Sequence, residues 1–266
     1  MKTDRSIIKR TQKGSSLKII CVLLLFFFLF SSCGDKKKSI QEKFSKKIDL
    51  KFKVPIDKVI KYNLRMSGKG GVFFKNPDPG KTKHHPEDIM EDYVLSFKGM
   101  ENGRIDLIWK YFQYNPDTGE KIPGKMVSFM ADDRLRTEGV DPGNFGILLK
   151  ILFPIPDKPV PVNQIWKKDL GTTGNEKGFI RSSIIGFETL GEQKCVKIKS
   201  EFDFLSEKES DFFRIEGDGI AYYSIRKNCF IDSNYKYSMR SKFLDKTTGE
   251  ELRIELLGSI EASLVK

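Results

Sequence analysis

Residues whose side chains commonly carry out chemistry are scarce in this sequence. Its two histidines, His84 and His85, are adjacent and lie just before Glu87 and Asp88. Imidazole and carboxylate groups together suit a transition-metal ion. Adjacent residues on extended backbone point to opposite sides, so a single short segment rarely completes a metal site. We therefore interpret these residues as a solvated loop and expect no metal and no other cofactor.

The common catalytic motifs are also missing from the sequence. It contains no Gly-x-Ser-x-Gly, no His-Glu-x-x-His, no Cys-x-x-Cys and no glycine-rich phosphate loop that ends in Lys and Ser or Thr. Glu201 and Asp203 would share one face of a strand, but polar residues on the solvent side of any strand have this spacing. We therefore expect no catalytic residues and predict that the protein is not an enzyme.

The N-terminus has the composition of an export signal. Six Lys or Arg and a single acid lie within the first eighteen residues, an uncharged apolar run occupies 19–30, and Ser31, Ser32 and Cys33 follow. This order of regions is typical of a secretory signal peptide. The apolar run has twelve residues, whereas a helix that spans a membrane needs about 20. We therefore interpret residues 1–32 as a cleaved signal peptide.

The residues before Cys33 resemble the lipobox of bacterial lipoproteins, in which one apolar and two small residues precede a cysteine that receives lipid. Phe30 stands where the strict pattern has Leu, and this departure is similar to the looser lipoboxes of spirochaete-type lipoproteins. The resemblance implies that Cys33 is acylated, for instance with palmitate. It also implies a lipid-anchored protein of the cell envelope, expected at the outer membrane and facing the periplasm or the cell surface.

Basic residues are concentrated near the N-terminus. The formal net charge is +11, from 47 Lys and Arg against 36 Asp and Glu. Residues 1–32 hold six basic and one acidic residue, and residues 34–53 hold eight and three, so residues 54–266 keep 33 and 32. We interpret the Lys- and Ser-rich segment 33–47 as a flexible basic tether. Because the rest of the chain is nearly neutral, we expect the membrane as a partner and no nucleic acid.

Two cysteines, Cys195 and Cys229, remain after signal cleavage and lipidation. An exported protein meets an oxidising compartment, in which such a pair can form a disulfide. Two free, buried thiols are the alternative. Sequence spacing does not tell whether the two Cα atoms come within bonding range, so both alternatives stay open.

From residue 48 onward, apolar and polar residues alternate with the period of two that is typical of half-buried strands. The stretch around Asn102 and Gly103 predicts a hairpin turn, and the glycines near Gly68 and Gly217 are interpreted as turns. Further strands are expected at 59–67, 125–131, 133–138, 163–169, 179–186, 193–204, 210–216, 219–226, 229–243 and 251–264. We predict a mainly β domain over 48–266, with one antiparallel, strongly curved sheet or open half-barrel (a β-clam).

One segment departs from this pattern. In residues 144–152, the side chains of Phe145, Leu148, Leu149 and Leu152 have helical spacing. A short apolar helix beside a large sheet either fills one end of the core or covers a ligand cavity, so these four residues are candidate lid residues.

A proline-rich segment follows this expected helix. The prolines over 154–161 remove backbone donors, so we expect this segment to cross the end of the sheet outside its hydrogen-bonded ladder. We expect Val162 and Ile165 to begin an inward-facing strand and Trp166 to be buried in the core.

Residues 152–166 resemble a Pro-x-x-x-Val-x-x-Gly-x-x-Trp motif of secreted, β-rich bacterial proteins of unknown function. Residues 186–198 and 217–228 resemble a strand–turn–strand and a Gly-x-Gly-x-x-Tyr strand of the same families. Asn163 and Asn228 stand where glycine is common in them. The resemblance implies a shared β scaffold, similar to the open half-barrel of bacterial lipid- and lipoprotein-carrier proteins. It implies no activity.

These patterns together predict a membrane-anchored envelope lipoprotein that is not an enzyme and that binds an apolar or lipidic ligand or another envelope component. The alternative is a surface-exposed interaction protein, an adhesin-like scaffold without a ligand cavity.

Overall fold

The structure is a computed structural model that describes residues 47–75, 83–114, 121–137, 144–171, 175–208, 211–244 and 251–265. They belong to one compact unit, Lys47–Lys266. The predicted signal peptide, Cys33 and most of the tether lie outside the described residues. Among the residues described, no helix has the length and hydropathy needed to cross a membrane.

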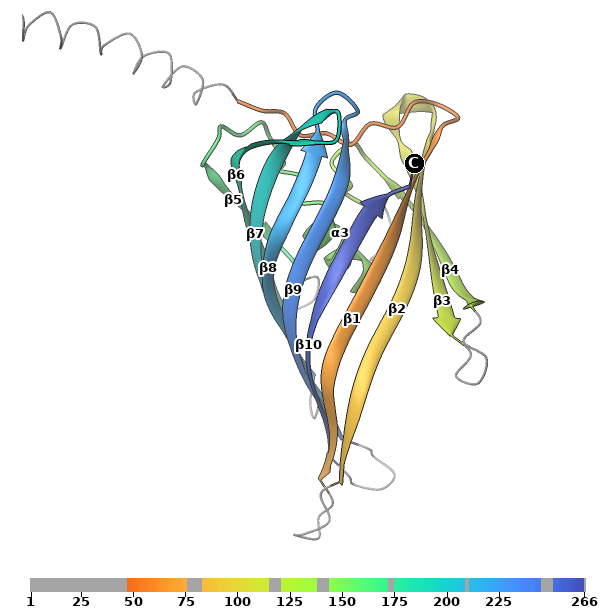
Figure 1. Cartoon of the computed structure of the whole chain (residues 1–266), viewed down its shortest axis with the longest axis vertical. Coiled ribbons are helices and arrows are strands. Elements are labelled where there is room, and N and C mark those ends of the chain that lie inside the picture. The colour runs from red at the N-terminus through yellow and green to blue at the C-terminus, as the bar shows by residue number, and fades with distance from the viewer. Residues whose placement is uncertain are drawn as a thin grey trace, which may run out of the picture. The chain divides into compact units, whose positions relative to one another are not determined.

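The described chain forms a single antiparallel sheet of ten strands (Figure 1). The strands are β1 (Val59–Lys75), β2 (Lys83–Gly99), β3 (Ile105–Tyr114), β4 (Lys121–Ala131), β5 (Ile165–Asp169), β6 (Glu176–Leu190), β7 (Gln193–Lys208), β8 (Asp211–Ser224), β9 (Cys229–Leu244) and β10 (Glu251–Leu264). A 3₁₀ turn, η1 (Glu101–Gly103), joins β2 to β3, and the helix α3 (Asn144–Leu152) lies between β4 and β5.

The strand order is β4-β3-β2-β1-β10-β9-β8-β7-β6-β5. The first and last strands therefore pair in the middle of the sheet, and β4 and β5 form its open edges. Figure 1 shows the sheet curled around α3, wide at one end and narrow at the other. The prediction of one strongly curved antiparallel sheet with a short helix around 144–152 is confirmed.

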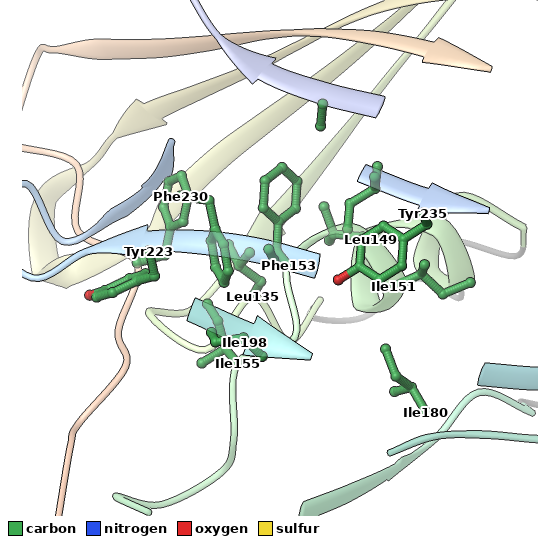
Figure 2. Close-up of a cluster of buried hydrophobic side chains, with 14 of the residues drawn as sticks. Leu135, Leu149, Ile151, Phe153, Ile155, Ile180, Ile198, Tyr223, Phe230 and Tyr235 are labelled. Atoms are coloured by element: carbon green, nitrogen blue, oxygen red, sulfur yellow. The ribbon is translucent and has the colours of Figure 1, made fainter. Parts of the chain in front are cut away.

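Buried apolar side chains fill the space between the sheet and α3 (Figure 2). Phe153, just after the helix, lies near the middle of this cluster and is 3% exposed. Its ring centroid is 5.0 Å from that of Tyr62 and 5.3 Å from that of Phe230. Burying a side chain of this size contributes about 1.5–3 kcal/mol, so Phe153 anchors the segment after α3 to the sheet.

The convex face of the sheet carries ion pairs. Arg214 lies 3.0 Å from Asp203 and 2.8 Å from Glu216, and Lys197 lies 2.8 Å from Glu188. Exposed ion pairs of this kind contribute at most about 1 kcal/mol each. They show that this face is in contact with water and that the apolar interior lies on the concave side.

Two glycine-containing stretches that were predicted to be turns are instead parts of the continuous strands β1 and β8. A Cβ atom on Gly68 would lie 2.7 Å from the hydroxyl oxygen of Tyr237. One on Gly217 would lie 2.1 Å from the carbonyl oxygen of Lys236. Gly68 therefore makes room for a side chain of β9, and Gly217 allows close approach of the neighbouring strand, which is the other common role of glycine in a sheet.

Left-handed backbone occurs at three asparagines that the sequence analysis singled out. Asn102 and Gly103 have φ of 62° and 73° in the turn between β2 and β3, so the predicted hairpin is confirmed. Asn163 has φ of 66° and Asn228 has φ of 52°. Asparagine is among the few residues that tolerate this conformation. This explains why it can stand where the resembling families have glycine.

The proline-rich segment 154–161 stays outside the hydrogen-bonded ladder of the strands, as predicted. In the described part of the chain it lies outside every strand, and Val160 forms an isolated bridge with Ile48. The predicted inward orientation of Ile165 is wrong, because this side chain is 65% exposed. In β5 the alternation turns Trp166 inward instead. We expected Trp166 to be fully buried, but it is half-buried against the core.

Candidate functional site at the wide end of the sheet

A pocket of about 1090 Å³ opens at the wide end of the half-barrel, and we call it the mouth pocket. Its apolar lining consists of Phe52, Val54, Pro55, Val59, Ile60, Ile105, Cys229, Leu264 and Val265. Its polar lining consists of Lys53, Asn102, Gly103, Asp132, Asp133, Arg136, Arg226, Lys227 and Asn228. Small-molecule sites usually enclose about 300–1,000 Å³, so the mouth pocket can hold a sizeable organic ligand.

One wall of the mouth pocket is the extended segment before β1. Leu50 and Phe52 are fully buried, while Lys53 is exposed, as the alternating pattern predicted. Two backbone hydrogen bonds hold the segment: Phe52 N–H donates to the carbonyl of Asp133 (2.8 Å), and Lys53 N–H donates to that of Asn228 (2.9 Å). The segment therefore fixes Lys53 at the opening, while the ring of Phe52 packs against the core ring of Phe97.

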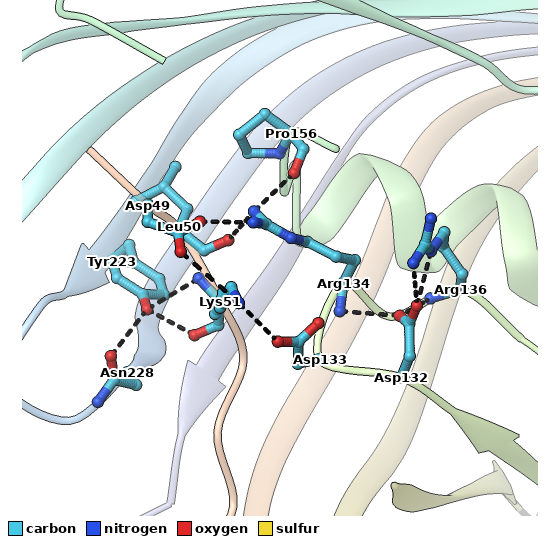
Figure 3. Close-up of polar contacts among 10 residues, drawn as sticks. All are labelled: Asp49, Leu50, Lys51, Asp132, Asp133, Arg134, Arg136, Pro156, Tyr223 and Asn228. Atoms are coloured by element: carbon cyan, nitrogen blue, oxygen red, sulfur yellow. Dashed lines mark hydrogen bonds and ion pairs between the residues drawn. The ribbon is translucent and has the colours of Figure 1, made fainter. Parts of the chain in front are cut away.

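A buried arginine joins this wall to the rest of the fold (Figure 3). Arg134, 8% exposed, donates from Nη1 to the carbonyls of Leu50 (2.7 Å) and Pro156 (2.9 Å). Its Nη2 atom forms an ion pair with Asp49 at 2.5 Å. Three segments distant in sequence therefore meet at one guanidinium group. Sequence reasoning missed this residue, because an arginine in a charged stretch carries no sign of burial.

The predicted strand 133–138 is wrong, because most of it forms a tight turn. Asp132 accepts hydrogen bonds from the backbone N–H groups of Arg134 (2.8 Å) and Arg136 (2.9 Å), and from Nε of Arg136 (2.6 Å). Burial raises the pKa of Asp132, but these hydrogen bonds outweigh it and lower the pKa overall. A side chain that caps its own backbone in this way favours a turn over a strand.

The charges on the rim of the mouth pocket do not balance. Asp132 pairs with Arg136 at 2.6 Å, and Asp133 pairs with Lys51 at 3.2 Å. Three further cations line the same rim: Lys53, Arg226 and Lys227. None of the three forms an ion pair with a carboxylate among the described residues. The rim is therefore positively charged over an apolar floor.

Tyr223 fixes the same wall from the sheet side. Its hydroxyl donates to the carbonyl of Lys51 at 2.6 Å and accepts from the N–H of Lys51 at 3.2 Å. Burial raises the pKa of Tyr223 to about 12, although the N–H of Lys51, which donates to the phenol oxygen, opposes this shift. The neutral phenol is therefore the form that holds the wall in place.

We expect Tyr223 to make folding stability sensitive to alkaline pH. A folded-state pKa above the unfolded value near 10 means that its contribution is complete below pH 10 and is lost as pH rises toward 12. The loss should be at most about 3 kcal/mol. Urea unfolding at a series of pH values should show that the difference in free energy of unfolding between the wild type and Tyr223→Phe shrinks between pH 10 and pH 12. A constant difference between the two proteins would contradict the assignment.

The four candidate lid residues lie on α3. Leu149 and Leu152 are buried in the core, and Leu148 is half-buried against it. The ring of Phe145 lies 4.9 Å from that of Trp109. None of the four lines the mouth pocket. Their role as a lid stays a prediction, and the packing shows α3 filling the concave side of the sheet.

Cys195 and Cys229 are free thiols, so the structure has the second of the two alternatives left open by the sequence. Both lie in register with Ser224, one on each side of β8. Two strand spacings separate their Cα atoms by about 10 Å, beyond the reach of about 7 Å for a disulfide. Burial raises the pKa of both thiols. Cys229 therefore contributes to the mouth pocket as an apolar side chain.

The histidine cluster is not in a loop, which corrects that interpretation. The backbone of His84 and His85 lies in β2, paired with Phe73 and Val72 of β1. The side chains lie outside the described part of the structure. Among the described residues, no group of three or more His, Cys, Asp or Glu is arranged to hold a metal ion.

No protein-family model and no curated protein matches this chain. Among solved structures, the chain is similar to a loop-L8 deletion mutant of OmpT, an outer membrane protein of Vibrio cholerae. The two share 10% sequence identity and a TM-score of 0.21, over 78% of this chain and 99% of that one. A likeness at this level supports no conclusion about function.

Proposed function

We propose that this protein is a membrane-anchored envelope lipoprotein that binds an apolar or lipidic ligand in the mouth pocket and catalyses no reaction. The observation that supports this proposal is the apolar floor of a pocket of about 1090 Å³ that is open to solvent. Partly exposed side chains such as Ile60 and Leu264 form part of this floor. A concave apolar surface with a few polar groups at its edge is typical of a small-molecule site.

The proposed anchor fits the position of the pocket in the chain. The described unit begins at Lys47, only a few residues before Phe52 and Lys53 in the pocket wall. An extended chain from Cys33 to Lys47 reaches at most about 50 Å. A lipid on Cys33 would therefore hold the mouth pocket close enough to a membrane to exchange ligands with it.

The chemistry of the pocket rim favours binding over catalysis. Asp132 and Asp133 are each neutralised by a nearby cation, and the thiol of Cys229 has a raised pKa. A nucleophile needs an adjacent base or a lowered pKa to act. These groups therefore support the proposal of a binding protein.

A scaffold that meets a protein partner is the second candidate function. It is favoured by the open edges of the sheet, where Ile122 and Met126 of β4 and Ile165 of β5 are exposed. An unpaired edge strand can accept a strand from another protein.

The anchor is tested at Cys33. We expect Cys33→Ala to abolish incorporation of labelled palmitate and to leave an uncleaved precursor, because the thiol that accepts the lipid is gone. Metabolic labelling followed by electrophoresis measures both effects, with Cys195→Ala as the matched control. Unchanged labelling of the Cys33→Ala protein would remove the anchor from the proposal.

The pocket is tested by filling it. Val59 lines the mouth pocket and is 48% exposed, so Val59→Trp should occupy the pocket without disturbing the core. We expect binding of the fluorescent probe 1-anilinonaphthalene-8-sulfonate to weaken about tenfold, which equals about 1.4 kcal/mol. Ile165→Trp, an exposed position outside the pocket, should leave binding unchanged. Equal binding by both variants would show that the ligand site lies elsewhere.

A further inference from the structure

The excess positive charge of the mouth pocket lies on one side of its opening. Lys53 comes from the segment before β1, whereas Arg226 and Lys227 come from the turn between β8 and β9. The hydrogen bond from Lys53 N–H to the carbonyl of Asn228, 2.9 Å long, holds the two segments side by side. Three cations from two segments that are distant in sequence therefore share one edge of the pocket.

The turn that carries two of these cations is held in place by its own hydrogen bond. Lys227 N–H donates to Oγ of Ser224 at 3.2 Å. Asn228 has φ of 52°, which turns the chain into β9 beside the apolar floor. Cys229 follows directly and is 2% exposed. The cations therefore lie next to the deepest apolar part of the lining.

We propose that the mouth pocket selects an acyl chain that ends in an anionic headgroup. The headgroup lies against Lys53, Arg226 and Lys227, and the acyl chain lies on the accessible apolar lining formed by Val54, Val59, Ile60 and Leu264. This inference rests on the proposed function and adds the charge of the ligand. The remaining rim charges, Asp132 and Asp133, are already paired and do not oppose an anion.

Two other candidate occupants of the mouth pocket, the protein's own tether and a nucleic acid, fit it less well than an anionic amphiphile does. The protein's own tether carries Lys36, Lys37 and Lys38, so the basic rim repels it. A nucleic acid would meet the cations but would leave the apolar floor uncovered. An anionic amphiphile satisfies both surfaces at once.

The test uses isolated membranes from cells that express the full chain. The probes are a diazirine-bearing palmitic acid and its methyl ester, which have the same acyl chain and differ in the charge of the headgroup. Photolysis and peptide mass spectrometry then locate the labelled segments. The test variant carries Lys53→Gln, Arg226→Gln and Lys227→Gln. The matched control carries the same loss of charge at exposed lysines outside the pocket: Lys110→Gln, Lys177→Gln and Lys236→Gln.

The acid probe should label peptides that contain Phe52 and Cys229 in the wild type and in the control. In the test variant this labelling should fall about tenfold, while labelling by the ester stays unchanged. An unchanged acid signal, or an equal loss with both probes, overturns the charge selection but leaves lipid binding in place. Absence of pocket labelling by either probe in the wild type overturns the proposed function as well.

Two natural sources share this chemistry, free fatty acids and anionic phospholipids. Unlabelled oleate and vesicles of phosphatidylglycerol should compete with the acid probe, and the stronger competitor identifies the source. Vesicles of phosphatidylcholine, which has no net charge, should compete weakly. Equal competition by phosphatidylcholine and phosphatidylglycerol would overturn selection by charge.

Discussion

Replacing Arg134 with methionine should lower the free energy of unfolding by about 3–5 kcal/mol, because removal of one partner leaves buried polar groups unpaired. The carbonyls of Leu50 and Pro156 would each lose a hydrogen bond, and Asp49 would lose its ion pair. Methionine keeps most of the side-chain volume, so the loss reports on the polar contacts. Urea unfolding followed by circular dichroism measures it.

The matched control is Arg136→Met in the same turn. Its guanidinium group is 65% exposed and pairs only with Asp132 in the described structure, so the expected loss is about 1 kcal/mol or less. If both variants lose the same stability, Arg134 does not hold the three segments together and the pocket wall is fixed in another way.

Truncating Phe153 to alanine should cost about 3–5 kcal/mol, since the removed ring leaves a cavity in the core. The ring packs against four others, from Phe52, Tyr62, Phe97 and Phe230. Thermal and urea unfolding both report the loss.

Two further truncations give losses of stability with which that of Phe153→Ala can be compared. Phe187→Ala removes the same ring from a position that is 49% exposed, and its effect should be small. Trp166→Ala should fall between the two, because Trp166 is half-buried against the core. If Trp166→Ala lowers the free energy of unfolding as much as Phe153→Ala does, Trp166 is a core residue, as its sequence motif predicted.

The alternation of apolar and polar residues was enough to predict a curved antiparallel sheet, because each strand faces the core on one side and water on the other. It did not predict that β1 pairs with β10, since strand order depends on contacts between residues far apart in the sequence. Gly68 and Gly217 were misread for a related reason. A glycine that makes room for a side chain or for a neighbouring strand looks the same in sequence as a glycine in a turn.

The mouth pocket was not predictable from sequence. Its lining comes from separate segments around Phe52, Asn102, Asp132, Lys227 and Leu264. No local pattern connects these segments, and the turn that contains Asp132 was expected to be a strand. From the sequence we considered a ligand cavity beneath α3, but the structure has the buried leucines Leu149 and Leu152 there. The sequence did show that residues 54–266 are nearly neutral. Against this balance, the cluster of unpaired cations at the rim of the mouth pocket indicates a site for a negatively charged group.

The central claim is that the mouth pocket holds a lipidic ligand. Its most direct test is native mass spectrometry of residues 47–266, purified without detergent from cells and compared with the Val59→Trp variant. This fragment contains the whole described core, so we expect it to fold alone. The wild type should retain a bound mass that dissociates as an acyl-chain lipid, and Val59→Trp should lack it. A wild-type fragment that is folded, free of lipid and unable to take up added oleate would contradict the account.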